Sequence, residues 1–151
     1  MKKVTIYTDG SCQGNPGPGG WAAILRYGKK ERVLSGGSPD TTNNRMELNA
    51  ALQALKALKE RCDVKLHTDS QYLKRAFTDG WIDKWRSNGW MTSARQPVKN
   101  QDLWQALWNE TQKHSVQWIK VKAHANNKLN NRVDQLAVSA GERVSRIAEH
   151  T

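Results

Sequence analysis

The sequence predicts an α/β fold of three layers, in which a mixed five-stranded sheet is flanked by helices. Five short segments alternate between polar and apolar residues, and the segments between and after them show helical periodicity. Three strands come first and should pair as an antiparallel meander, whereas the last two follow helices and should return in parallel. With 151 residues, we expect one domain that spans residues 1–151.

The first strand is predicted to end at Asp9, where a turn-rich stretch begins. Val4, Ile6 and Thr8 fall on one face of the extended segment, and Asp9 falls on the other. Residues 10–20, GSCQGNPGPGG, combine glycines, which permit close backbone approach, with prolines, which block pairing in a sheet. Taken by itself, this stretch is also explained as a surface turn that the aspartate caps.

The other elements are predicted from changes in period along the chain. Strands at 21–28 and 31–37 should form a hairpin, and further strands are predicted at 64–69 and 116–124. Helices are predicted at 41–61, from Ser70 onward, within the tryptophan-rich segment 79–90, and at 100–114 and 130–150. The order of elements is therefore βββαβαααβα.

The charge balance indicates a polyanionic partner. Lys and Arg number 24 against 14 Asp and Glu, for a net charge of +10, which favours nucleic acid, with simple solubility as the alternative. No apolar run approaches the roughly 20 residues that cross a bilayer. Cys12 and Cys62 lack the spacing of a disulfide framework or a metal site. We therefore expect a cytoplasmic protein with no membrane partner, and we further expect a monomer.

Four acidic residues are predicted to meet at one edge of the sheet. Asp9 and Asp69 both close strands that run in parallel, and the carboxyl ends of such strands share an edge. Glu47 lies in the first turn of the 41–61 helix, on its apolar face, which should turn toward the sheet. Asp134 begins the last helix on a similar seam.

Each of these acids also has a purely structural explanation. Asn44 and Glu47 match a capping box, and Asp134 is a favourable charge near a helix N-terminus. Together, however, four converging carboxylates repel one another by several kcal/mol, which a fold tolerates when cations bind there. Carboxylate ligands favour Mg²⁺ or Mn²⁺ over zinc, and two such ions about 4 Å apart can stabilise a phosphodiester displacement.

Four stretches carry a family resemblance: TDGSCQGNPGPGG, TTNNRMEL, HTDSQY and VKAHANNKLNNRVDQLA. In this order and spacing they resemble bacterial type 1 ribonuclease H, over nearly the whole chain. The resemblance implies the ribonuclease H fold and hydrolysis of the RNA strand of RNA·DNA hybrids, with 5′-phosphate and 3′-hydroxyl ends. It also implies a site for two Mg²⁺ ions, with Mn²⁺ as a substitute, built from Asp9, Glu47, Asp69 and Asp134.

The resemblance further implies residues that assist catalysis and hold the hybrid. His124 matches an assisting histidine that shuttles a proton or helps product release, and the alternative is a hydrogen-bonded loop histidine. Thr42 would bind a DNA-strand phosphate or serve as an N-cap, and the glycine loop would lie against the minor groove, where RNA displays its 2′-hydroxyls. The positions that match hybrid contacts are Gly10, Cys12, Asn15, Thr42, Asn43, Asn44, Gln71 and Asn130.

Segment 79–90 resembles a basic, tryptophan-bearing handle that many bacterial members lay against the DNA strand. Seven tryptophans in a chain of this size are expected mostly in the core, so few of them should meet a substrate. The candidate contacts of the handle and its surroundings are Trp81, Lys84, Trp85, Arg86, Lys99 and Trp104.

The segment before Asp134 departs from the family pattern. Ala123 and Asn126 stand where the family often has glycines beside the histidine, and Asn131 replaces an acidic residue. We therefore expect the four-acid core to be retained with an altered metal dependence. A non-catalytic module that binds hybrids or double-stranded RNA is the alternative from another class, and a different nuclease on the same fold, such as a junction resolvase, is the second.

Overall fold

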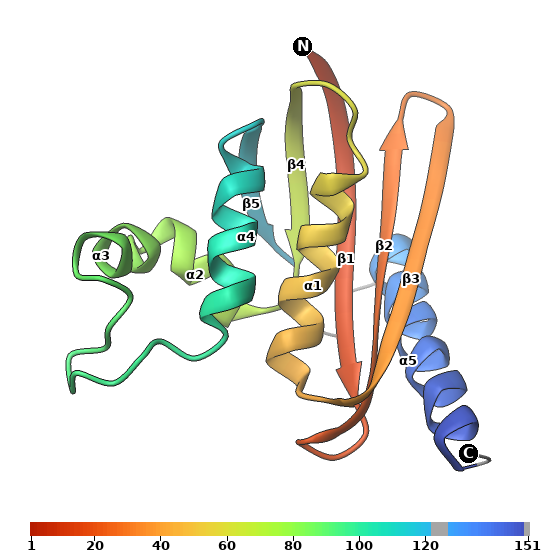
Figure 1. Cartoon of the computed structure of the whole chain (residues 1–151). Helices are drawn as coiled ribbons and strands as arrows, with labels where there is room; N and C mark the ends of the chain where they lie inside the picture. The colour runs from red at the N-terminus through yellow and green to blue at the C-terminus, as the bar shows by residue number, and fades with distance from the viewer. Residues whose placement is uncertain (122–126, 150–151) are drawn as a thin grey trace.

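The computed structural model describes residues 1–121 and 127–149, which form a five-stranded sheet with helices on both faces (Figure 1). The strands are β1 (Lys2–Cys12), β2 (Gly17–Tyr27), β3 (Lys30–Thr41), β4 (Cys62–Thr68) and β5 (Ser115–Lys120). The helices are α1 (Asn43–Lys56), α2 (Gln71–Thr78), α3 (Trp81–Ser87), α4 (Gln101–Thr111) and α5 (Lys128–Glu149). The order of elements along the chain is the predicted one.

The sheet has the strand order β3-β2-β1-β4-β5. The pairs β1–β2 and β2–β3 are antiparallel, and the pairs β1–β4 and β4–β5 are parallel. This arrangement confirms the predicted mixed sheet, because short turns connect the antiparallel strands and helices connect the parallel ones. The central strands β1 and β4 therefore bring their carboxyl ends to one edge of the sheet.

The sequence predicts that the first strand ends at Asp9, but β1 continues to Cys12. Cys12 pairs with Gly19, because β2 already begins at Gly17. Glycine weakens a strand without removing its backbone donors and acceptors, so the ladder runs on through this stretch. Residues 13–16 form the loop between the two strands.

Two apolar cores hold the three layers together. The larger core lies between the sheet and helices α1, α2 and α4, and it encloses Ile6, Leu48 and Leu66 completely. The smaller core lies between the sheet and α5, where Ile24 packs against Val133. Alternate residues of the central strands thus supply both cores, which explains why the side-chain period predicts these strands well.

Two glycines allow helices to approach the sheet closely. A Cβ atom on Gly10 would overlap the backbone of Met46 and Glu47 in α1, and one on Gly20 would overlap the backbone of α5 at Ala137. A residue without a side chain is needed at both positions. Glycines of the stretch after Asp9 therefore serve the packing of α1 and α5 against the sheet.

The bounds of α1 and α5 differ from the sequence prediction in ways that bear on the site. Helix α1 is shorter than 41–61, because Thr42 is its N-cap and accepts a hydrogen bond from the Arg45 backbone N–H at 3.2 Å. Helix α5 begins at Lys128, so Asp134 lies in its second turn and not at its start. Within residues 1–121 and 127–149, no helix has the length and apolar character needed to cross a membrane.

Candidate metal centre and nucleic-acid interface

An open depression of about 400 Å³ lies at the carboxyl ends of β1 and β4, beside the start of α1. This is the end toward which the arrows of β1 and β4 point in Figure 1. The depression brings the four predicted acids to one site, together with three predicted hybrid contacts. Its lining residues are Asp9, Gly10, Ser11, Cys12, Asn43, Glu47, Asp69, Ser70 and Asp134.

Three of the acids form a tight cluster. One carboxylate oxygen from each of Asp9, Glu47 and Asp69 lies within 4.8 Å of the other two. Tyr7 and His67 are register partners on the parallel strands β1 and β4. The residues two positions further along, Asp9 and Asp69, therefore leave the sheet side by side on the same face. The parallel pairing thus places these two aspartates together, as the sequence predicts.

Glu47 reaches the cluster from the buried face of α1. It is 3% exposed, and its Oε1 accepts a hydrogen bond from the Gly10 backbone N–H at 3.1 Å. The capping-box explanation is therefore wrong, because Glu47 bonds to β1 while Thr42 caps the helix. Because α1 begins at Asn43, Glu47 lies in its second turn and not in its first. The hydrogen bond links α1 directly to the strand that carries Asp9.

The second oxygen of Glu47, Oε2, is buried and has no hydrogen-bond partner among residues 1–121 and 127–149. A buried carboxylate oxygen without a donor is costly, and this carboxyl group lies beside those of Asp9 and Asp69. Clustered carboxylate oxygens are the ligands that Mg²⁺ and Mn²⁺ prefer. The three acids thus fit a hard divalent cation.

Burial raises the pKa of all three clustered carboxyl groups. The pKa of Asp9 rises from 3.8 to about 7, first because of desolvation and then because of Asp134 and Asp69. Desolvation and the charge of Asp9 raise the pKa of Glu47 well above its ordinary value, and desolvation and Asp134 raise the pKa of Asp69. A bound cation would reverse this balance by favouring the ionised forms.

Asp134 lines the same depression from α5, but it is exposed. In the part of the chain that the structure describes, the tight carboxylate cluster consists of Asp9, Glu47 and Asp69 without Asp134. Asp134 is nevertheless close enough to raise the pKa of Asp9 and Asp69. The structure therefore brings three predicted metal ligands together and places the fourth at the rim.

Several predicted hybrid contacts surround the acidic depression. Asn15, in the loop after β1, accepts a hydrogen bond from the Asn43 backbone N–H at 3.2 Å, so the loop and the start of α1 form one surface. Asn44 is exposed beside Asn43, and Gln71 is exposed at the first position of α2. Asn130 differs from these residues, because it is 8% exposed in the first turn of α5.

Sequence reasoning missed Ser11 and Ser70, which also line the depression. Ser70 is the N-cap of α2, and its hydroxyl accepts a hydrogen bond from the Leu73 backbone N–H at 3.1 Å. Each serine follows Asp9 or Asp69 within two residues, in the motifs TDGS and TDS. This repetition is the signal that could have identified both serines.

The tryptophan-bearing segment presents two separate surfaces. Trp81, Lys84 and Trp85 line one open depression on α3. Arg86 lines another, where its guanidinium group stacks on the ring of Trp108 at 3.6 Å from the ring centroid. Stacking on a tryptophan orients the guanidinium group and keeps part of its charge in contact with an aromatic face. The predicted contacts of the handle therefore do not form one continuous row.

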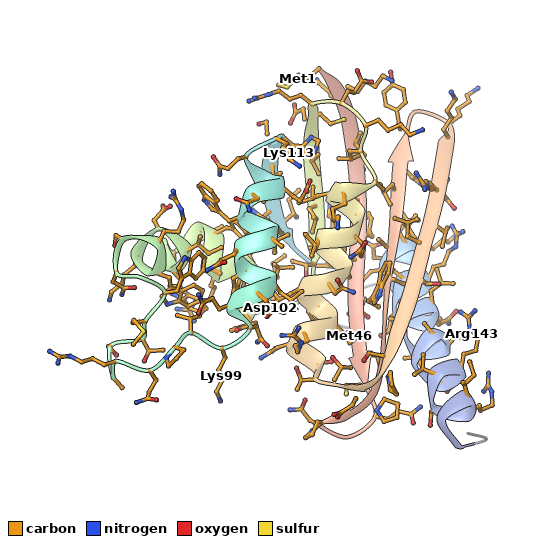
Figure 2. All side chains as sticks on the ribbon, viewed as in Figure 1. Met1, Met46, Lys99, Asp102, Lys113 and Arg143 are labelled. Atoms are coloured by element: carbon orange, nitrogen blue, oxygen red, sulfur yellow. The ribbon has the colours of Figure 1, made fainter. Side chains whose placement is uncertain are left out.

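Trp104, a predicted substrate contact, lies in the large core and offers no exposed surface to a ligand in this structure. Its side chain is fully buried, and its indole N–H donates a hydrogen bond to the Tyr72 hydroxyl at 3.1 Å. Trp104 is buried because it shares with Leu107 the face of α4 that enters the large core. Lys99, by contrast, is exposed on the chain that leads into α4, at the same end of the molecule as Met46 (Figure 2).

Some of the predicted residues are not tested by the structure. His124, Ala123 and Asn126 lie outside the described residues, so the assisting role of the histidine stays a prediction. Asn131 is exposed in the first turn of α5, where its backbone N–H donates to the Asn127 carbonyl at 3.0 Å. Both cysteines are free, in line with the lack of disulfide spacing.

Relatives of known sequence place the chain among bacterial ribonucleases H. The family model for RNase H matches residues 1–142. The chain is 57% identical over 140 residues to ribonuclease H of Moorella thermoacetica, covering 93% of this chain and 92% of that protein. It is 58% identical over 137 residues to ribonuclease H of Hahella chejuensis, covering 91% and 92%.

Solved structures share the fold. LC9-RNase H1, a type 1 RNase H with the type 2 active-site motif, matches with a TM-score of 0.85 at 30% identity, over 95% of this chain and 74% of that chain. LC11-RNase H1, solved in complex with an RNA/DNA hybrid, matches with a TM-score of 0.69 at 20% identity, over 93% and 97%. The mixed sheet and the carboxylate cluster define an α/β nuclease. The chain belongs to the ribonuclease H family.

Proposed function

We propose that the chain is an endoribonuclease that hydrolyses the RNA strand of RNA·DNA hybrids, leaving 5′-phosphate and 3′-hydroxyl ends. The cluster of Asp9, Glu47 and Asp69 at the carboxyl ends of β1 and β4 carries this proposal. An acidic cluster in a chain of net charge +10 suits a polyanion whose cleavage needs cations. Membership of the ribonuclease H family supports the choice of substrate.

We propose Asp9, Glu47, Asp69 and Asp134 as ligands of two Mg²⁺ ions, with Mn²⁺ as a substitute. The bound ions would supply charge stabilisation for the attacking and leaving oxygens of a phosphodiester displacement. The hydrogen bond from the Gly10 N–H orients the Glu47 carboxylate before any ligand binds. Asp134 comes from a different layer of the fold, so its place at the rim depends on how α5 packs on the sheet.

We propose that the loop 13–16 and the starts of α1 and α2 bind the minor groove of the hybrid. Asn15, Asn43 and Asn44 offer amide groups that both donate and accept hydrogen bonds, as a 2′-hydroxyl requires. Gln71 offers the same groups from α2. A strand that lacks 2′-hydroxyls cannot make these bonds, so the contacts would direct cleavage to RNA.

The handle would bind the DNA strand. Trp81 and Trp85 offer aromatic surface beside the Lys84 ammonium group in one depression, a combination suited to a sugar–phosphate backbone. Lys99 is exposed at the end of the molecule that carries the acidic depression (Figure 2) and adds a further cation. Arg86 is held on Trp108, so its contribution depends on the hybrid reaching that second surface.

We also propose that the chain acts as a monomer in the cytoplasm. All four acids of the depression come from one chain, and the two free cysteines suit a reducing compartment. Size-exclusion chromatography with light scattering should give a mass near the 17.1 kDa of one chain. A stable dimer would contradict the proposed monomer and leave the nuclease assignment untouched.

Cleavage of end-labelled duplexes tests the proposed activity. RNA·DNA hybrid, double-stranded RNA and double-stranded DNA are each incubated with the protein, with Mg²⁺ and with EDTA. We expect cuts in the RNA strand of the hybrid only, in Mg²⁺ only. Binding of the hybrid without any cutting in Mg²⁺ or Mn²⁺ would favour the non-catalytic module. Equal cutting of double-stranded DNA would favour another nuclease on the same fold.

A further inference from the structure

A stacked aromatic pair lies on β1 and β4, two residues before the aspartates of the acidic cluster. The rings of Tyr7 on β1 and His67 on β4 have centroids 4.3 Å apart and an interplanar angle of 6°. The two residues are register partners on parallel strands, and each stands two positions before an aspartate of the cluster. Because strand side chains alternate, both rings lie on the same face as Asp9 and Asp69, one step earlier along the strands.

The Tyr7 hydroxyl extends from this pair to the start of α5. The Asn127 amide Nδ2 donates a hydrogen bond to the hydroxyl at 3.2 Å. The Asn127 Oδ1 accepts a hydrogen bond from the Asn130 backbone N–H at 3.1 Å, and its carbonyl accepts one from Asn131 at 3.0 Å. Asn127 is therefore the N-cap of α5, and the same side chain ties that cap to β1.

This tie matters because α5 carries Asp134. Asp134 lies seven residues after Asn127, about 10 Å further along the helix axis. On the other side of Asp134, the backbone of α5 at Ala137 lies against Gly20 of β2. The helix is thus held to the sheet both before and after the residue that lines the acidic depression. At Asn127 the described residues join α5 to β1 by the hydrogen bond to Tyr7, and Leu129 and Val133 add apolar packing one turn further along.

We infer that Tyr7 and Asn127 are positioning residues for the reaction, which set the place of Asp134 relative to Asp9 and Asp69 through their hydrogen bond. The inference rests on the proposed function, because it takes Asp134 as a metal ligand. Both residues act through α5 and have no direct part in holding the hybrid. Loss of their contact therefore lowers kcat and leaves the KM for the hybrid unchanged.

Tyr7→Phe is the direct test, because it keeps the ring that stacks on His67 and removes the hydroxyl alone. We expect kcat to fall by about 3- to 10-fold, as a small misplacement of a reacting group does, with KM unchanged. Amide hydrogen exchange should become faster at Asn130 and Asn131 and stay the same in β4. Tyr27→Phe removes an exposed hydroxyl from the last residue of β2 and is the matched control.

Variants of Asn127 form the second arm of the test. Asn127→Ala removes both the cap and the tie, so adding Tyr7→Phe to it should cause no further loss of kcat, because both changes break one contact. Asn127→Asp can still cap α5 and can accept a hydrogen bond from the Tyr7 hydroxyl. We therefore expect Asn127→Asp to keep kcat within about twofold of the unchanged protein.

Three results would overturn the inference. The first is a Tyr7→Phe protein with unchanged kcat and unchanged exchange in α5, and the second is a double variant whose losses multiply. The third is exchange that becomes faster by the same factor in β4 and in α5, because the contact would then serve only global stability. A protein that fails to cut hybrids would refute the proposed function. Hydrogen exchange needs no substrate, so the exchange data would still decide whether Tyr7 holds α5 in place.

Discussion

The buried charge of Asp9 lowers the stability of the metal-free fold, and the same charge is what would attract a cation to the site. It is 4% exposed, and its pKa of about 7 shows that the ionised form is disfavoured where it stands. Glu47 and Asp69 add to the crowding, and the pKa of each is raised as well. A role of Asp9 in the turn before Gly10 would not require its carboxyl group to be buried beside those of Glu47 and Asp69.

Replacing Asp9 with Asn should therefore separate stability from activity. In EDTA, we predict that Asp9→Asn raises the free energy of unfolding by about 1–3 kcal/mol, because it removes a buried charge beside two others. Cleavage of the hybrid in Mg²⁺ should fall to background. Urea unfolding and the cleavage assay measure the two effects. Asp134→Asn is the control: the residue is exposed, so activity should fall with little gain in stability.

The outcomes of the Asp9→Asn experiment differ in what they contradict. An active variant would refute the assignment of Asp9 as a metal ligand. An inactive variant that is less stable than the unchanged protein would leave the catalytic role in place and refute the argument from crowded carboxylates.

The stability gain should also depend on pH. Below about pH 4, Asp9 is protonated in both the folded and the unfolded chain, so its charge has no effect on folding. As the pH rises from about 4 to about 7, the unfolded chain loses this proton first, and the metal-free protein becomes less stable. The advantage of Asp9→Asn should therefore grow over this range and level off above it. An advantage that is the same at pH 4 and pH 8 would contradict the raised pKa.

At the scale of elements, Gly10 joins the end of β1 to the start of α1. Its N–H donates to Glu47, and an added Cβ would lie 2.5 Å from the Met46 carbonyl carbon. We predict that Gly10→Ala lowers the free energy of unfolding by about 1–3 kcal/mol, because α1 must move as a unit. Activity should fall by about tenfold to a hundredfold as Glu47 moves with the helix. Urea unfolding and steady-state kinetics measure these losses, and a variant with normal activity would show that α1 need not stay in place.

The cap of α1 has two proposed roles that one pair of variants can distinguish. The Thr42 hydroxyl accepts a hydrogen bond from the Arg45 N–H, so Thr42→Ala should cost about 1 kcal/mol of stability, and Thr42→Ser should cost little. If Thr42 also binds a phosphate of the DNA strand, Thr42→Ala should raise KM and Thr42→Ser should not. A stability loss with an unchanged KM would leave the N-cap as its role.

At the scale of the whole molecule, the position of a basic side chain should determine how much it contributes to hybrid binding. Lys99 lies at the end that carries the acidic depression, whereas Lys113 lies at the opposite end (Figure 2). We predict that Lys99→Ala weakens binding and reduces the slope of log affinity against log salt by about 1, the value for one phosphate contact. Lys113→Ala removes the same charge and should change neither quantity. Both lysine variants are made in the Asp9→Asn protein, so that the hybrid stays intact during the titrations. Equal effects of Lys99→Ala and Lys113→Ala would show that only net charge matters.

The sequence by itself determined the order of the elements, the mixed sheet and the meeting of Asp9 with Asp69. These features depend on local periodicity and on the rule that parallel strands share a carboxyl edge, and both are readable without the fold. An aspartate near the carboxyl end of each of two parallel strands was sufficient to predict where the acidic site lies.

Only the tertiary structure decided which partner each ambiguous residue takes. Glu47 matches a capping box, yet it bonds to Gly10 because β1 lies against that face of α1. Trp104 matches a substrate contact, yet the large core encloses it. The tie between Tyr7 and Asn127 joins residues 120 positions apart. Each local pattern is compatible with several partners, and the bond that forms depends on what packing places opposite the side chain.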